Sequence, residues 1–346
     1  MKVGLMIGYS GAKYRLPMDL ILEAEAAGYD SVWSAEAWGS DAITPLAWIL
    51  ARTTKLKAGT AICQIPARTP ANMAMTAMTL DQLSGGRFIL GVGPSGPQVV
   101  EGWYGDAYGK PLARSKEYIA IIRKILAREE PLTHDGEHYQ IPYRGVGSTG
   151  LGKPLKSILH GNPDLPIYTA SFTPAGVRMA GEVADGFFPV WMDPDRFDLF
   201  EGPLNDGFAK AGGGKSIANF DVAPFVRMAM GDDIAACRMK VKQGLALYIG
   251  GMGARKKNFY NDYAKTLGYE EAAVKIQDLF LGGEKEAAAA AVPDQLVDDT
   301  ALVGPPGHIR EQLTRWKDAA ARGHVGTMIV SLGAPEEARF LAEELL

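Results

Sequence analysis

The side chains in this sequence that could do chemistry follow short apolar runs, at places where buried strands would end. Glu36 is the first acidic residue at such a position, and it lies between Trp33 and Trp38 and could carry a proton. Its companions at such positions are mainly rings, amides and hydroxyls: Tyr9, Ser10, Gly11, Trp38, Asp41, Cys63, Gln64, Arg68, Ser95, Gln98, Glu101, Trp103, Tyr104, Ser171, Phe172, Thr173, Trp191 and Arg227. This set is poor in metal ligands and favours a flat ring with polar edges as the ligand.

Two roles are open to Glu36. Burial between Trp33 and Trp38 would favour its protonated form, so that Glu36, with Trp38 beside it, handles a proton near neutral pH. Alternatively, Glu36 only pairs with an arginine at the same edge. The candidates for a substrate pocket are Trp103, Trp191 and Glu101, and core packing explains the tryptophans almost as well.

A glycine pattern lies in the middle of these candidates. Residues Gly91–Gly96 match G-x-G-x-x-G, which in dinucleotide-binding proteins opens a helix under a pyrophosphate. Here Pro94 and Pro97 argue against a helix opening on the last glycine, and no acid follows at the end of the next strand. The pattern therefore favours a loop whose backbone passes close to a ligand.

Two histidines invite a metal interpretation. His134 and His138 are four residues apart, but Gly136 between them predicts a turn rather than a helix. Surface histidines are the simpler explanation, so the sequence predicts no metal site.

Eight apolar runs alternate with helical patterns and must position these candidates. Because near-continuous apolar strands separated by helices are typical of a parallel sheet covered on both faces, we expect a (β/α)₈ barrel, with its functional residues at the carboxyl ends of the strands. The expected strands are Val3–Ile7, Ser31–Ala35, Leu56–Ile62, Phe88–Val92, Ile167–Ala170, Gly186–Val190, Asp221–Val226 and Thr327–Ser331. The expected helices are Pro17–Ala27, Thr44–Arg52, Ala71–Leu83, Ala113–Arg128, Pro174–Val183, Pro194–Lys210, Gly307–Arg322 and Pro335–Leu345.

Two segments are longer than ordinary connections within this single domain of residues 1–346. Residues 127–164 read as an excursion with a hairpin, and residues 232–299 as a helical insertion near the barrel mouth that forms a lid, a dimer surface or both.

Composition excludes several classes of protein. The chain has 346 residues and a formal net charge of −4, with no basic run, so nothing indicates nucleic-acid binding. No apolar stretch is long enough to span a bilayer. Two cysteines make no disulfide framework, and we expect a cytoplasmic protein.

Four blocks of the sequence resemble the luciferase-like family of flavin- and deazaflavin-dependent oxidoreductases. These are Glu23–Trp33, Gly59–Ile62, Thr79–Gly93 and Met179–Gly186, with a later landmark at Val303–His308. The continuation from Ser95 to Gly105, with Lys110–Arg114, is similar to the actinobacterial branch that uses coenzyme F420.

The resemblance implies where the coenzyme binds. In F420-dependent members a non-proline cis peptide in strand three faces the deazaflavin, and by position it falls at Ala61–Ile62. The coenzyme phosphate rests on the loop after strand five, here Ala170–Thr173, where relatives have glycines in place of Phe172 and Thr173. The implied coenzyme-binding residues are Ala61, Ile62, Gln64, Gly93, Ser95, Gln98, Ala170, Ser171, Phe172 and Thr173.

The resemblance also implies an activity. We expect an F420-dependent oxidoreductase that moves a hydride between the deazaflavin and an organic substrate, with Glu36 handling the proton. The chain lacks the Asp-His pair and the strand-four glutamate of the sugar-phosphate dehydrogenase branch, which argues against that substrate. The alternatives are an FMN-dependent monooxygenase and a coenzyme-binding protein without catalysis. Family members are commonly dimers, and we expect a homodimer.

Overall fold

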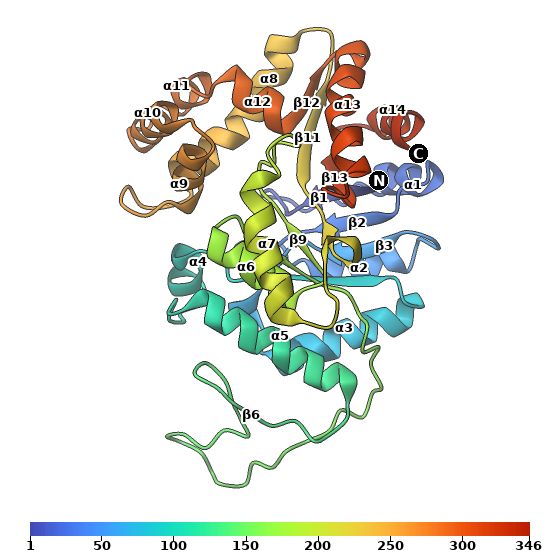
Figure 1. The fold of residues 1–346 in the computed structure, drawn as a ribbon, viewed down its shortest axis with the longest axis vertical. Coiled ribbons are helices and arrows are strands. Elements are labelled where there is room, and N and C mark those ends of the chain that lie inside the picture. The colour runs from blue at the N-terminus through green and yellow to red at the C-terminus, as the bar shows by residue number, and fades with distance from the viewer.

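The structure is a computed structural model that describes residues 1–346, and its centre is a closed parallel barrel (Figure 1). The first six barrel strands pair in sequence order, each parallel to the next, and the last pairs with the first. They are β1 (Lys2–Gly8), β2 (Ser31–Ser34), β3 (Lys57–Thr60), β5 (Phe88–Gly93), β8 (Ile167–Ala170), β9 (Gly186–Phe188), the pair β10 (Asp221–Val222) and β11 (Phe225–Met230), and β13 (Thr327–Ser331). All eight expected strands are present, which confirms the (β/α)₈ barrel.

The seventh barrel strand is made of two pieces. β10 pairs with β9, and β11 pairs with β13, so the chain itself closes the barrel between them. The break falls at Ala223 and Pro224, and proline has no N–H to donate to a ladder. Beyond β13, the upper part of β11 pairs with β12 (Ala301–Gly304), a strand that the sequence analysis missed.

The third barrel strand is also divided into two pieces. β3 ends at Thr60, the peptide bond between Ala61 and Ile62 is cis, and the short strand β4 (Cys63–Gln64) then pairs with the end of β5. The cis peptide lies where the family resemblance placed it.

The expected helices cover the outside of the barrel, with ends within a few residues of the predicted ones. Thr69 and Thr173 cap two of them by accepting hydrogen bonds from the N–H groups of Asn72 and Gly176, and Gly85 ends α3 in the left-handed conformation. The helices around the barrel are α1 (Met18–Ala26), α2 (Ile43–Leu50), α3 (Pro70–Ser84), α5 (Pro111–Ala127), α6 (Pro174–Val183), α7 (Asp198–Ala211), α13 (Pro306–Ala321) and α14 (Pro335–Leu345).

One further helix contradicts the sequence analysis. The six-residue helix α4 (Pro97–Gly102) opens directly after Gly96. Pro97 occupies its first position, where a missing N–H costs nothing, so this proline begins the helix instead of preventing it.

The apolar core has an inner and an outer part. A large cluster of 52 buried residues fills the space between strands and helices. Inside the barrel, Trp33 packs with Tyr168 and Phe188, and it lies so close to Gly59 that a Cβ there would come within 2.2 Å of its ring. Because Trp33 fills the barrel interior and donates from Nε1 to Ser31, it does not flank Glu36 as expected.

Two excursions leave the barrel at opposite ends of the molecule (Figure 1). The first holds the hairpin of β6 (His134–Asp135) and β7 (Gln140–Ile141) and continues into a projecting segment, residues 142–158, called the arm below. The carboxylate of Glu117 in α5 anchors the hairpin by accepting hydrogen bonds from the backbone of residues 137–139 and by pairing with His134.

The second excursion, between β11 and β12, is helical and packs in a cluster of 16 buried residues that also includes Ala229 of β11 and Val303 of β12. Its helices are α8 (Ile234–Ala246), continued by a π-helical turn over Leu247–Gly251, then α9 (Phe259–Thr266), α10 (Glu270–Leu281), α11 (Lys285–Ala290) and α12 (Asp294–Thr300). Nowhere in the chain does a helix combine the length and apolar character that crossing a membrane requires.

Candidate functional site

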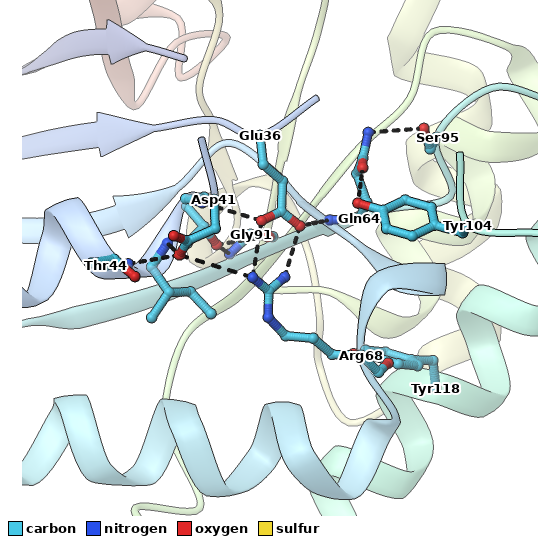
Figure 2. Close-up of polar contacts among 12 residues, drawn as sticks. Glu36, Asp41, Thr44, Gln64, Arg68, Gly91, Ser95, Tyr104 and Tyr118 are labelled. Atoms are coloured by element: carbon cyan, nitrogen blue, oxygen red, sulfur yellow. Dashed lines mark hydrogen bonds and ion pairs between the residues drawn. The ribbon is translucent and has the colours of Figure 1, made fainter. Parts of the chain in front are cut away.

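Glu36 lies at the carboxyl end of the barrel strands, in a fully occupied network (Figure 2). Its side chain is 4% exposed. Arg68 donates to both carboxylate oxygens, at 2.8 and 3.1 Å, and the backbone N–H groups of Gln64 and Ala42 donate to them at 2.7 and 3.1 Å. The carboxylate accepts all four hydrogen bonds, two of them from one guanidinium, so the arrangement stabilises its ionised form.

These contacts favour the second of the two roles considered for Glu36, an ion pair with an arginine at the barrel mouth. Arg68 also lies 3.9 Å from Asp41, so that one guanidinium faces two carboxylates. Trp38 does not enclose Glu36, because its side chain is 53% exposed.

A second polar group, made of Gln64, Ser95 and Tyr104, is connected to Glu36 through the backbone of Gln64. Gln64, held at its backbone N–H by Glu36, places its carboxamide between two hydroxyls (Figure 2). Tyr104 donates to Gln64 Oε1 at 2.6 Å, and Gln64 Nε2 donates to Ser95 Oγ at 3.0 Å. Burial, and then the charge of Glu36, raise the pKa of Tyr104, so its hydroxyl stays protonated and remains a donor.

Two residues in the loops at the mouth have an unusual backbone. Ser95 after β5 and Trp191 after β9 have φ angles of 63° and 48°, in the left-handed region that bulky side chains rarely adopt. Such conformations cost of order 1–3 kcal/mol and concentrate at functional sites. Their presence at two strand ends supports a ligand site at this end of the barrel.

A small apolar group lies beside this network. The half-buried Ile62 packs against Gly93, where a Cβ would lie 2.9 Å from its Cδ1 and 3.7 Å from the Cβ of Ala170. Ala61 is buried next to it. The residues expected to face a coenzyme ring are thus brought together here.

The loop after β8 forms a cradle for an anion. Ser171 Oγ makes no hydrogen bond and lies over Gly176, where a Cβ would come within 1.8 Å of it. Thr173 caps α6, a helix of 10 residues, by accepting from Gly176 N–H at 3.2 Å. A helix N-terminus and a free hydroxyl suit a phosphate.

The insertion supplies residues that the sequence analysis missed. Tyr248, Tyr260 and Tyr263 pack with Phe172 and Trp191 into what is called the aromatic wall below. Ring centroids lie 5.1 Å apart for Phe172 and Tyr260, 5.6 Å for Trp191 and Tyr260, and 4.8 Å for Tyr248 and Tyr260. The run Phe259–Tyr263, with three aromatic residues in five, is the signal that could have indicated Tyr260 and Tyr263.

The aromatic wall continues to the loop after β1. Burial, followed by the charge of a nearby Tyr9, raises the pKa of Tyr260 to about 12. The pKa of Tyr248 is raised even further, again mainly by burial and next by Tyr9. These hydroxyls are protonated at neutral pH and can donate hydrogen bonds.

Other expected residues are placed outside these groups. Gln98 and Glu101 are exposed on α4, and Trp103 directly after it is 62% exposed. For the two histidines the structure gives a simple role, because His134 pairs with Glu117. The chain contains no cluster of three or more side chains placed to ligate a metal ion.

The mouth therefore offers three kinds of contact: the polar chain Ser95–Gln64–Tyr104, the cradle at α6 and the aromatic wall. A planar heterocycle with a phosphate on its side chain could use all three. No side chain in these three groups is a nucleophile activated by a neighbouring base.

Comparison with known proteins gives consistent matches over the whole chain. The family description of luciferase-like monooxygenases matches residues 1–323. A Mycobacterium tuberculosis protein, provisionally named as a coenzyme F420-dependent oxidoreductase, is 45% identical over 99% of this chain and 98% of its own length. The chain resembles the F420-dependent tetrahydromethanopterin reductase of Methanopyrus kandleri with a TM-score of 0.78 and 20% identity, over 99% and 97% of the two chains. It also resembles an F420-dependent secondary alcohol dehydrogenase, solved with an F420–acetone adduct, with a TM-score of 0.75 and 18% identity, over 99% and 98%.

Proposed function

The chain belongs to the luciferase-like monooxygenase family, and from that premise we propose that it is a coenzyme F420-dependent oxidoreductase. It transfers a hydride between C5 of the deazaflavin and a carbon of an organic substrate, in reduction of a C=O or C=C bond or in the reverse oxidation. The observation that carries this choice of coenzyme is the relative from M. tuberculosis, which is 45% identical across nearly the full length of both chains.

The residues at the mouth fit this coenzyme. Ser171, without a partner above Gly176, and the first turn of α6 would hold its phosphate. Ala61, Ile62, Gly93 and Ala170 offer an apolar surface for the ring. When bound, F420 supplies the carbon that gives or takes the hydride.

The polar chain then orients the substrate. Ser95 Oγ accepts from Gln64, so its own hydrogen is free to donate to an oxygen in the mouth. Tyr104 donates to Gln64 and fixes the direction of the carboxamide. In this proposal Ser95 holds the substrate oxygen and passes the proton that accompanies the hydride to or from that oxygen, exchanging it with solvent between turnovers, while Gln64 and Tyr104 are positioning residues.

Glu36 is a positioning residue in the same proposal. Its carboxylate holds the backbone of Gln64 and the side chain of Arg68, and it reaches the reaction only through them. The aromatic wall excludes water from the mouth and favours a substrate with an apolar body.

The experiment that tests the coenzyme is fluorescence titration of the purified protein with F420 and, separately, with FMN. We expect tight F420 binding and no FMN binding. FMN binding instead would replace this proposal with the monooxygenase, and oxygen consumption would then be assayed.

One variant distinguishes the contribution of the phosphate cradle to coenzyme binding from that of the apolar surface for the ring. In Gly176→Ala the added Cβ displaces Ser171, so we expect about tenfold weaker F420 binding, which corresponds to loss of one hydrogen bond to a charged group. Binding of the deazaflavin chromophore that lacks the phosphate and acidic tail should not change. Tight F420 binding by a protein that turns over no carbonyl or enone substrate would favour the non-catalytic alternative.

A further inference from the structure

Arg227 lies at the barrel mouth on the inner side of its strand. In β11, Phe225 stacks on Phe188 inside the barrel, while Val226 and Met228 belong to the outer core. Because side chains alternate along a strand, Arg227 points to the same side as Phe225, one step nearer the carboxyl end. Arg227 is exposed. An inner side chain at this height can reach solvent through the mouth.

The guanidinium of Arg227 has no partner of its own. It makes neither an ion pair nor a hydrogen bond, whereas Arg68 at the same mouth is held by Glu36. It rests against Gly244 of α8, where a Cβ would come within 2.5 Å of Nη1 and 2.8 Å of Cζ. Because Gly244 has no side chain, the flat guanidinium can lie directly against the helix.

The neighbours of Arg227 are the hydroxyl end of the aromatic wall. Gly244, against which the guanidinium rests, and Tyr248 are four residues apart along α8 and its π-helical continuation, so Arg227 and Tyr248 meet the same stretch of the insertion. Burial and Tyr9 raise the pKa of Tyr248, and the positive charge of Arg227 acts in the opposite direction. An unpaired cation thus stands next to phenol donors and apolar rings. All five donors of a guanidinium point outward in one plane, a geometry that matches carboxylate and phosphate oxygens.

We propose that Arg227, lying on Gly244, binds a carboxylate or phosphate group of the substrate, so that the substrate is an acid with an apolar body. This inference rests on the proposed function for the reaction, and it adds the class of substrate. The acidic group would lie on Arg227 and the apolar body along the aromatic wall.

The coenzyme is the other possible source of an anion. Its phosphate already has a cradle at the start of α6, after β8. One barrel strand, β9, separates β8 from the seventh strand that carries Arg227, so Arg227 and that cradle stand at different strand ends. This separation favours the substrate as the source.

The test uses three variants. Arg227→Gln removes the charge. Gly244→Ala keeps the arginine but fills its place, and alanine suits a helix better than glycine, so the variant will fold. Arg322→Gln is the matched control, because Arg322 is also exposed and unpaired but follows α13 at the other end of the barrel.

The probes are phenylacetate and phenyl phosphate, with phenylacetamide as the neutral match, titrated by NMR with and without saturating F420. We expect the wild type and Arg322→Gln to bind the two acids more tightly than the amide. In Arg227→Gln and Gly244→Ala, the affinity for the acids should fall about 10- to 100-fold, the usual effect of losing a charged hydrogen-bonded pair, with the amide unaffected.

Three results would overturn the inference: a wild type without preference for the acids, a preference that survives in Arg227→Gln, or Arg227→Gln weakening F420 while the phosphate-free chromophore binds normally. The last would assign Arg227 to the coenzyme. The titrations without F420 measure the contribution of Arg227 to binding of the acids even if F420 does not bind. Failure of the proposed function is therefore distinguished from failure of this inference.

Discussion

Glu36 and Arg68 form the kind of pair whose two halves depend on each other. Both side chains are largely withdrawn from water, at 4% and 19% exposure, and each satisfies the other's charge. Removing one partner of such a pair leaves an uncompensated charge in a poorly solvated place, which costs more than the intact pair contributes.

Arg68→Met should therefore lower the free energy of unfolding by about 3–5 kcal/mol, measured by urea denaturation. The double variant Glu36→Gln/Arg68→Met should recover part of this loss, because no unpaired carboxylate then remains at position 36. A single variant as stable as the wild type would contradict the buried ion pair.

A variant of Glu36 tests whether this residue carries a proton or only positions its neighbours. If Glu36 carried a proton, Glu36→Gln would abolish turnover across the whole pH range while F420 still bound. For a positioning residue, activity falls but persists, with the shape of the pH profile unchanged, and this is our expectation. The comparison requires variants of similar stability, which the unfolding measurements establish.

At the scale of elements, strand packing explains the first two glycines of the G-x-G-x-x-G match, Gly91 and Gly93. A Cβ on Gly91 would come within 1.8 Å of the carbonyl oxygen of Thr60, and the Thr60 hydroxyl both donates to Gly91 O and accepts from Gly91 N–H. Gly93 similarly admits Ile62. The close approach that the sequence analysis expected at a ligand is, at Gly91, an approach between neighbouring strands.

Gly91→Ala should destabilise the protein by about 1–3 kcal/mol or more, since an overpacked site must push β3 away from β5. Gly102→Ala is the matched control, because nothing lies within 4 Å of its added Cβ and it sits at the end of a helix. Thermal unfolding of both variants measures the difference. Equal stability of the two would contradict the packing role of Gly91.

The barrel could be predicted because each strand is a short apolar run with helix signals on either side, as in Phe88–Gly93. The same local logic failed for α4, where a proline read as a break is the first residue of the helix. It also missed β12, which is defined by its pairing with β11 far back in the chain.

The candidate site was predictable only in part. Strand ends indicated Gln64, Ser95 and Ser171, because parallel strands deliver their loops to one edge. The partner of Glu36 could not be chosen from the sequence, since Arg68 becomes its neighbour only when strands two and three are paired. The tyrosines of the wall come from an insertion whose path no local pattern fixes.

At the scale of the whole molecule, the arm is an apolar surface without a partner in its own chain. Val146 is 99% exposed, Leu151 85%, Leu155 70% and Ile158 95%. Exposed apolar side chains gathered within one segment are typical of interaction surfaces. The family resemblance leads us to expect a homodimer, and we propose that a second copy of the chain covers the arm in it.

Light scattering during size-exclusion chromatography should therefore give twice the mass of the chain for the wild type. The double variant Leu151→Glu/Ile158→Glu should shift it to a monomer, because buried carboxylates without partners oppose association. The control Leu281→Glu changes an exposed leucine on α10, at the other end of the molecule, and should remain dimeric. A wild-type monomer, or a double variant that stays dimeric, would contradict the role of the arm.

The pairing of β11 with β12 has a consequence for how this chain can diversify. The insertion departs after Met230, at the carboxyl end of β11, and returns at Ala301, the first residue of β12, which is the register partner of Arg227. Both ends of the helical excursion therefore belong to one parallel ladder of four residue pairs. We expect changes of length within the excursion to leave the register of the barrel strands unaltered. Under the proposed function, exchange of the excursion would alter the part of the mouth formed by Tyr248, Tyr260 and Tyr263, so a transplanted insertion offers a route to new acceptor preferences.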